Sequence, residues 1–323
     1  MNKSKAKLIF NKYGMFLVLL ALFIICACLS EVFLTKDNLL NVARQVSIIG
    51  IVSIGMTFVI LTGGIDLSVG PTLAGSSLLI AGIYNSFSSA GIEGIHVAII
   101  CFIAALAFGA LVGFINGIVI TVFEVQPFIV TLGMMTAVKG VGLLYSDGSP
   151  IIGTPPDLQW IGQGKIFGEI PVQAILFIIV AVAAWAILKY TPLGRYTYAI
   201  GGNQEASRLS GINVKKITTS IYSISGLLAG FAGVLMATQL NIGEAKVGDQ
   251  MEMDAIAAVV IGGTSLKGGV GSVIGTIIGV LIMGFLSNLL NLISVPSYYQ
   301  MIFKGVIIVG ATILQSLQER KKA

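Results

Sequence analysis

The residues of this chain that could do chemistry are ionisable side chains set among apolar segments. Asp66 lies between two apolar segments, directly after Gly63, Gly64 and Ile65 and two residues before Ser68. Charged side chains are costly inside a membrane, and they mark solute paths or helix ends. Two interpretations therefore stay open for Asp66: a polar gate residue, or the N-cap of the helix that follows.

The inventory of reactive side chains argues against an enzyme. The single histidine, His96, opens an apolar segment, and Cys26, Cys28 and Cys101 lie inside apolar runs. One histidine so placed cannot complete a Ser-His-Asp set, and no spacing suits a metal cluster or a disulfide framework. The phosphate-binding pattern G-x-x-x-x-G-K-[ST] does not occur either. We therefore expect no catalytic residue, no metal and no cofactor.

The composition is that of a membrane protein. Of 323 residues, 56% are hydrophobic and only 10% are charged, with a mean hydropathy of +0.96. A soluble domain carries about 25% charged residues. The net charge of +5 is therefore no sign of nucleic-acid binding. We expect an all-α polytopic membrane protein in which residues 1–323 form one transmembrane domain.

The apolar segments suggest about ten membrane passages in two halves. The N-terminal half covers residues 14–145 and the C-terminal half residues 171–316. The ten segments are 14–30, 46–62, 67–84, 96–121, 128–145, 171–188, 217–238, 253–263, 271–290 and 299–316. The segment 253–263 is only about half a span, and Asp254 stands at its start as an expected cap or interfacial acid.

The distribution of positive charge predicts the orientation. With ten passages and the N-terminus inside, the inward pieces hold 12 Lys and Arg residues and the outward pieces hold 4. Cytoplasmic loops carry such an excess. Both termini and the loop 189–217 are therefore predicted to be cytoplasmic. Lys139 and Lys304 sit near the ends of spans, where they can snorkel to the interface.

The two halves share a glycine-rich frame. The stretch around Gly63 and Gly64 aligns with the stretch around Gly262 and Gly263 at an offset of 199 residues. Gly-interrupted apolar segments at corresponding places are typical of transporters. A pathway or gate is one interpretation, and it would include Ser68 and Ser265. The other interpretation is a pair of tight turns between closely packed helices.

Further glycines and amides lie within the apolar segments. Gly109, Gly113 and Gly117 recur every four residues, as do Gly271, Gly275 and Gly279. Such faces let helix backbones approach closely, and we expect close packing there without chemistry. The amides of Asn116 and Asn288 can bond a solute hydroxyl or a neighbouring helix, and both possibilities remain open.

The loop 189–217 contains a short capped helix. Asn203 is suited to N-cap it, Glu205 stands in the first turn, Arg208 follows at i+3, and Gly211 stands where a left-handed C-cap prefers glycine. A capped helix between two spans is suited to docking against another protein. An ordinary solvated loop is the alternative.

These motifs resemble those of a known family. Glu205-Ala206-Ser207 followed by Gly211 resembles the EAA loop of ABC importer permeases. Residues 35–310 as a whole look like monosaccharide permeases of the ribose-transporter type. The stretches that carry this resemblance are Gly55-Met56-Thr57, 63–70, 193–196, 201–203, 208–213, 254–260, 262–266 and 297–300.

The resemblance implies the partners and the coupling residues. It implies a separate ATPase subunit with two nucleotide-binding domains, an extracytoplasmic sugar-binding protein and a second permease copy, most simply in a homodimer in the bacterial inner membrane. The residues expected to couple to the ATPase are Asn203, Glu205, Ala206, Arg208, Leu209 and Gly211. The residues expected at the gate or path are Gly63, Gly64, Asp66, Ser68, Gly262, Gly263, Ser265, Asn116 and Asn288.

The expected function is ATP-driven import of a monosaccharide, with ribose or a related sugar as the cargo. The run 243–248 departs from the family pattern, so the sugar stays open. The alternative is a secondary transporter driven by an ion gradient. That alternative needs a relay of intramembrane acids or histidines. Asp66 and Asp254 alone supply little of one.

Overall fold

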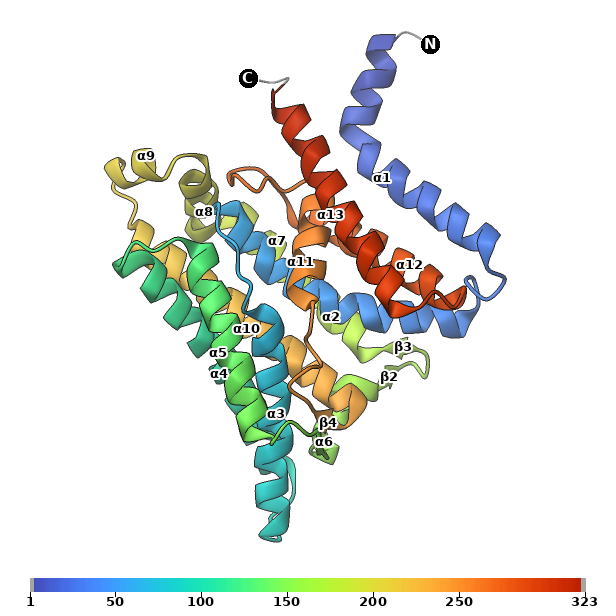
Figure 1. The fold of residues 1–323 in the computed structure, drawn as a ribbon, viewed down its shortest axis with the longest axis vertical. Coiled ribbons are helices and arrows are strands. Elements are labelled where there is room, and N and C mark those ends of the chain that lie inside the picture. The colour runs from blue at the N-terminus through green and yellow to red at the C-terminus, as the bar shows by residue number, and fades with distance from the viewer. Residues whose placement is uncertain (1–2, 321–323) are drawn as a thin grey trace.

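The chain folds into a bundle of helices with very little β-structure. The computed structural model describes residues 3–320, and it describes side chains for residues 14–310, 312 and 313. The side chains of the terminal lysines and of Arg320, which carry part of the charge argument, lie outside this described set. Figure 1 shows the start of helix α1 and the end of helix α13 at the top, helices α8 and α9 at the upper left, and helix α6 with three of the strands lower down on the right.

Thirteen helices lie within the described residues. The first five are α1 (Lys3–Leu29), α2 (Lys36–Leu61), α3 (Val69–Ser89), α4 (Ile95–Val122) and α5 (Pro127–Tyr145). The middle group is α6 (Pro156–Gln163), α7 (Val172–Tyr190), α8 (Pro192–Gly202) and α9 (Gln204–Leu209). The last group is α10 (Val214–Leu240), α11 (Met251–Ile261), α12 (Val273–Leu292) and α13 (Ser297–Arg320).

Two short antiparallel strand pairs tie the connections between helices together. β1 (Ile151–Ile152) pairs with β4 (Ile242–Gly243), and β2 (Lys165–Ile166) pairs with β3 (Ile170–Pro171). The first pair joins the α5–α7 connection to the α10–α11 connection. Both pairs lie away from α9 in Figure 1.

Six of the described helices are long and apolar enough to cross a membrane, namely α2, α4, α5, α7, α10 and α12. The chain is therefore a polytopic membrane protein, as predicted. Helix α11 has 11 residues. At 1.5 Å per residue it is about 16 Å long, or half of a bilayer core of roughly 30 Å. The expectation of about ten passages in two related halves goes beyond this finding and stays a prediction.

Helices α2 and α10 form the centre of the bundle. The most apolar window of α2 is 83% buried, whereas that of α5 is only 17% buried. Helix α10 packs against α4, α3 and α2. The interior thus lies around α2 and α10, and α5 is left at the periphery with most of its surface exposed.

Glycines set the distance between α4 and α10. A Cβ added to Gly109 would lie 2.2 Å from the carbonyl oxygen of Gly226, and one added to Gly113 would lie 2.0 Å from that of Tyr222. Contacts this short exclude any side chain there. The ladder at 109–117 is therefore a packing face within this chain, as the sequence indicated.

The second glycine ladder packs in the same way. A Cβ on Gly279 would lie 1.8 Å from the carbonyl oxygen of Ala258, and one on Gly275 would lie 2.1 Å from that of Gly262. These two glycines bring α12 against α11. The third member, Gly271, precedes α12 and belongs to the connection between the two helices.

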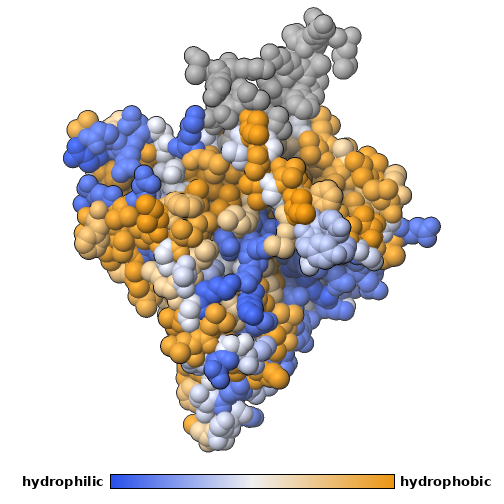
Figure 2. All heavy atoms as spheres, in the orientation of Figure 1, coloured by the Kyte–Doolittle hydropathy of each residue, from blue (hydrophilic) through white to orange (hydrophobic). Residues whose placement is uncertain are grey.

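The surface matches a membrane location. Figure 2 shows hydrophobic side chains over most of the visible face and hydrophilic ones gathered at the upper left, where Figure 1 draws α9. A hydrophilic strip runs down the middle, where Figure 1 draws the connection from β4 to α11. A further hydrophilic area lies to the right of this strip, near where Figure 1 draws β2 and β3, so polar regions interrupt a surface that is otherwise suited to lipid.

Candidate functional site

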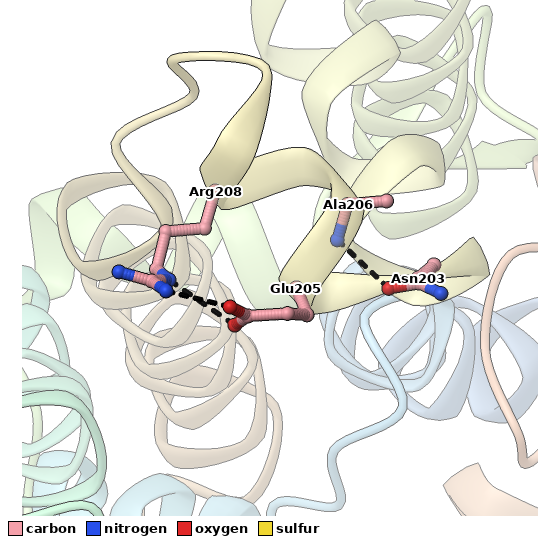
Figure 3. A network of polar contacts seen from close by, with 4 residues as sticks. All are labelled: Asn203, Glu205, Ala206 and Arg208. Carbon is pink, nitrogen blue, oxygen red and sulfur yellow. Dashed lines mark hydrogen bonds and ion pairs between the residues drawn. The ribbon is translucent and has the colours of Figure 1, made fainter.

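The short helix predicted in the loop 189–217 is present as α9. Its N-cap is Asn203, whose Oδ1 accepts the backbone N–H of Ala206 at 2.9 Å. Arg208 donates to Glu205, with Nη2 2.6 Å from Oε1. Figure 3 shows both contacts on the same turn of chain. The predicted cap and i+3 pair are therefore confirmed as structure.

The end of α9 also follows the prediction. Gly211 has φ +84°, and its N–H donates to the carbonyl of Arg208 at 3.0 Å. A glycine adopts this left-handed conformation without strain. Leu209, just before this turn, is 76% exposed. Helix α9 thus presents an apolar side chain and an ion pair to its surroundings.

The ion pair lowers the pKa of its acidic member, Glu205. The hydrogen bond from Arg208 and its positive charge lower the pKa of the Glu205 carboxyl below its usual value. Since the pKa is depressed, the pair's stabilisation is present at neutral pH and fades as pH falls through the folded-state pKa. Both side chains are about two-thirds exposed, so the pair adds little to folding. Its place on the surface suits recognition by a partner.

Helix α8 connects α9 to the two predicted breaks. A Cβ on Gly201 of α8 would lie 1.8 Å from the carbonyl oxygen of Leu61 and 2.4 Å from the nitrogen of Gly269. That carbonyl of Leu61 accepts the N–H of Gly269 at 2.9 Å. Tyr198 of α8 also donates its hydroxyl to the carbonyl of Gly271 at 2.9 Å. We call the meeting point of Leu61, Gly201 and Gly269 the three-way junction.

The two breaks are helix-ending turns of one design. In each, a glycine with positive φ donates its N–H to the carbonyl three residues back, and the next residue donates to the carbonyl five residues back. The pairs are Gly63 to Ile60 and Gly64 to Val59 after α2, and Gly263 to Val260 and Thr264 to Val259 after α11.

The structural repeat differs from the sequence alignment by one residue. Gly63 with φ +80° matches Gly263 with φ +83°, so the equivalent positions are 200 residues apart and the predicted offset of 199 was wrong. The alignment paired glycine doublets, but the turn is defined by the left-handed residue. That residue is the first glycine of one doublet and the second of the other.

In each doublet, close packing also excludes a side chain at the glycine that does not have the positive φ. A Cβ on Gly64 would lie 2.4 Å from the hydroxyl oxygen of Tyr222, and one on Gly262 would lie 2.4 Å from the carbonyl oxygen of Gly275. Ser265 is buried in the second break, where its backbone N–H donates to Val270. The doublets are therefore tight turns, and a turn at such a place can also serve as a gate.

Asp66 joins three helices. It is fully buried, and its Oδ1 accepts the hydroxyl of Ser68 at 2.6 Å and the backbone N–H of Ser68 at 3.1 Å. Its Oδ2 accepts the hydroxyl of Ser225 on α10 at 2.9 Å. Asn116 of α4 donates to the Ser68 hydroxyl at 2.9 Å. The N-cap of α3 is Ser68, so the interpretation of Asp66 as that N-cap was wrong, and Asp66 instead lies at the centre of a buried network.

The two predicted amides differ in their surroundings. Asn288 of α12 exchanges two hydrogen bonds with Asn38 of α2, at 2.8 and 3.0 Å. Asn288 therefore makes the interhelical contact that was one of its two predicted roles. The Oδ1 of Asn116 is buried without a hydrogen-bond partner among the described residues. Of the two amides, Asn116 is therefore the one whose oxygen could accept a further hydrogen bond.

A set of charged contacts near the hydrophilic strip was not predicted as part of the site. Lys139 of α5 donates to Asp249 at 2.7 Å, and Lys304 of α13 donates to Asp254 of α11 at 2.7 Å. Both lysines reach acids within the protein, so the prediction that they snorkel was incomplete. Glu252 is buried on α11 as well. The available signal was the presence of lysines in otherwise apolar helices.

Comparison with known proteins identifies the family. The model described as "Branched-chain amino acid transport system / permease component" matches residues 38–312. The chain belongs to this family. It is accordingly a permease component, a non-catalytic membrane subunit of a transport system. Within the described residues, no group of three or more His, Cys, Asp or Glu side chains is placed to hold a metal ion.

Individual relatives are similar over nearly their whole length. The chain is 47% identical over 317 residues to the ribose import permease protein RbsC of Bacillus subtilis (strain 168), which covers 98% of this chain and 94% of the relative. It is 46% identical over 308 residues to RbsC of Escherichia coli (strain K12), covering 94% and 93%. It is 36% identical over 333 residues to the galactose/methyl galactoside import permease protein MglC of the same organism, covering 100% and 99%. No solved structure matches this chain.

Proposed function

We propose that this chain is the membrane permease of an ATP-driven importer whose cargo is ribose. The observation that supports ribose as the cargo is the near-full-length identity of 46–47% to ribose import permeases of two bacteria, against 36% to a galactose permease. Family membership favours this function over the ion-gradient-driven alternative. The buried acids also support it, since Asp66 and Asp254 sit in separate hydrogen-bonded sites and form no relay.

The partners follow from the kind of transporter. A permease without a nucleotide-binding motif needs a separate ATPase subunit, here proposed to carry two nucleotide-binding domains. An extracytoplasmic sugar-binding protein would deliver the cargo, and a second copy of this chain would complete the path in the bacterial inner membrane. We place both termini and α9 in the cytoplasm, in accord with the excess of Lys and Arg in the pieces predicted to lie inside.

The proposed mechanism passes through the three-way junction. The ATPase holds α9 at its exposed pair of Glu205 and Arg208 and at Leu209. Helix α8 precedes α9 with only Asn203 between them, so a displacement of α9 would also displace Gly201 at the end of α8. Because Gly201 touches both Leu61 and Gly269, this movement reaches both breaks at once. The gate would then open where Asp66, Ser68 and Asn116 line the first break.

Uptake of labelled sugar tests this proposal. Host cells that lack their own ribose permease are used. They should recover ribose uptake when this chain is expressed together with the ATPase and the binding protein of its own system. A tenfold excess of unlabelled ribose should suppress the signal, and the same excess of galactose should not. Uptake that survives ATP depletion, or that follows galactose, would contradict the proposal.

A further inference from the structure

A shallow, open cavity lies between α4 and α10 at the end of the bundle that carries α9. Its volume is about 680 Å³. Thr121 of α4 and Thr219 of α10 line it, and their hydroxyl oxygens lie 3.2 Å apart. Beyond them the glycine ladder presses the two helices together, so the cavity is a groove between their ends. Figure 1 shows these ends at the left, beneath α9.

One side of the groove is strongly positive. Lys215 and Lys216 line it, both are exposed, and neither forms an ion pair with any described residue. They stand in the first turn of α10, which contains no acid and where the helix dipole adds partial positive charge. No acidic side chain lines the groove. Glu124 follows α4 nearby and interacts with Arg208, but no described acid forms an ion pair with either lysine, so this side attracts an anion.

The other side of the groove is apolar and faces outward. Phe114, Ile118 and Val122 form one stripe of α4, and Phe114 and Val122 are about half exposed. The most apolar window of α4 is only 33% buried, so this stripe belongs to the face that meets the bilayer. Ser220 and Ser223 also line the groove, and each donates its hydroxyl hydrogen to a carbonyl of its own helix at 2.9 Å, that of Lys216 and that of Thr219.

We propose that this groove binds an anionic phospholipid of the inner leaflet. The phosphate would lie between Lys215 and Lys216, the glycerol region beside Ser220 and Ser223, and one acyl chain along Phe114, Ile118 and Val122. A soluble anion would leave the apolar stripe unused, and a zwitterionic lipid would leave the two lysines uncompensated. The groove has the polarity of a lipid, and its position requires only that α9 lie on the cytoplasmic side.

Occupation of the groove would affect the coupling segment. Only residues 210–213 separate α9 from α10. Asn213 both lines the groove and accepts the N–H of Lys216 at 3.0 Å. A lipid held by the lysines would therefore fix the start of α10 and, with it, the position of α9. Anionic lipid would act as a positioning ligand, independent of which sugar is carried.

Native mass spectrometry of the full-length purified chain tests the proposal. Phosphatidylglycerol and phosphatidylcholine are each titrated onto the delipidated protein in detergent. We expect a preference of about tenfold or more for phosphatidylglycerol. The double variant Lys215→Gln/Lys216→Gln should lose that preference. The matched control Lys165→Gln/Lys246→Gln removes the same charge from two exposed lysines elsewhere and should keep it.

Two further measurements separate a lipid from other occupants. Ser220→Trp fills the groove without changing charge, and it should weaken binding of phosphatidylglycerol at least severalfold. Soluble glycerol phosphate should fail to compete with the lipid. Equal competition by glycerol phosphate would overturn the proposal, as would an unchanged lipid preference in the lysine double variant. If that variant instead lost only its binding to the ATPase subunit, the groove would be a protein interface and the proposal would again be wrong.

Discussion

At the scale of single residues, we expect the substitution of Asp66 to have the largest effect on local stability. A buried carboxylate is costly unless it is hydrogen-bonded, and this one accepts three hydrogen bonds from Ser68 and Ser225. Its removal would leave three donors buried without an acceptor. The network thus explains why an acid is tolerated at this depth, whether or not the solute passes beside it.

Substitution of Asp66 distinguishes its two proposed roles. Asp66→Ala should destabilise the protein by several kcal/mol, at about 1–3 kcal/mol for each unsatisfied donor. Asp66→Asn keeps an acceptor oxygen and should cost much less. The midpoint of thermal unfolding in detergent measures both.

The transport activity of the milder variant completes this test. If Asp66→Asn stays folded but transports no sugar, its charge belongs to the gate. If it stays folded and transports normally, Asp66 has a structural role only. An Asp66→Ala protein as stable as the wild type would contradict the network described above.

At the scale of elements, α8 is the part that joins a surface helix to the interior. Its two final glycines are in different environments, although they are adjacent in the sequence. A Cβ on Gly201 meets the backbone of Leu61 and Gly269, whereas a Cβ on Gly202 has no atom within 4 Å. This pair supplies a variant and a matched control within one turn of helix.

We expect Gly201→Ala to reduce ATP-dependent sugar uptake by tenfold or more, because its methyl group must displace α8 from the three-way junction. Gly202→Ala should transport normally. Both proteins should reach the membrane and co-purify with the ATPase subunit, since α9 itself is unchanged. Uptake by Gly201→Ala at the wild-type rate would show that coupling does not pass through the junction.

At the scale of the whole molecule, α9 and the β2–β3 turn lie far apart on the structure, as Figure 1 shows. Leu209, the last residue of α9, is 76% exposed, and Phe167 is 92% exposed in the turn between β2 and β3. If α9 is cytoplasmic, these two positions report opposite sides of the membrane. Of the native cysteines, Cys28 is exposed and must first be replaced, while Cys26 and Cys101 are buried.

Labelling of sealed cells checks this orientation. In a Cys28→Ser background, a membrane-impermeant maleimide added outside should modify Phe167→Cys and leave Leu209→Cys unmodified. Inverted vesicles from cells that lack the ATPase subunit, which would otherwise cover Leu209, should give the reverse pattern. Modification of Leu209→Cys from outside would place α9 on the wrong face and would remove the basis for the proposed coupling to an ATPase.

Much of the local structure could be read from the sequence, because its causes are local. Asn203, Glu205, Arg208 and Gly211 act on backbone groups or side chains within a few residues of themselves, and the structure confirms the helix that they predicted. The same reasoning found the short helix α11 and the packing role of the glycine ladders. Composition alone was sufficient to establish a membrane protein.

The membrane class, the helix caps and the family motifs thus follow from the order of amino acids alone. The contact between Leu61, Gly201 and Gly269 could be known only from the packed fold. The same holds for the contacts of Asp66 with Ser225 and of Lys304 with Asp254. The reason is that capping and hydropathy depend on neighbours along the chain. The junction and the buried networks depend on how helices cross, and a crossing is fixed only when all of their faces are packed together.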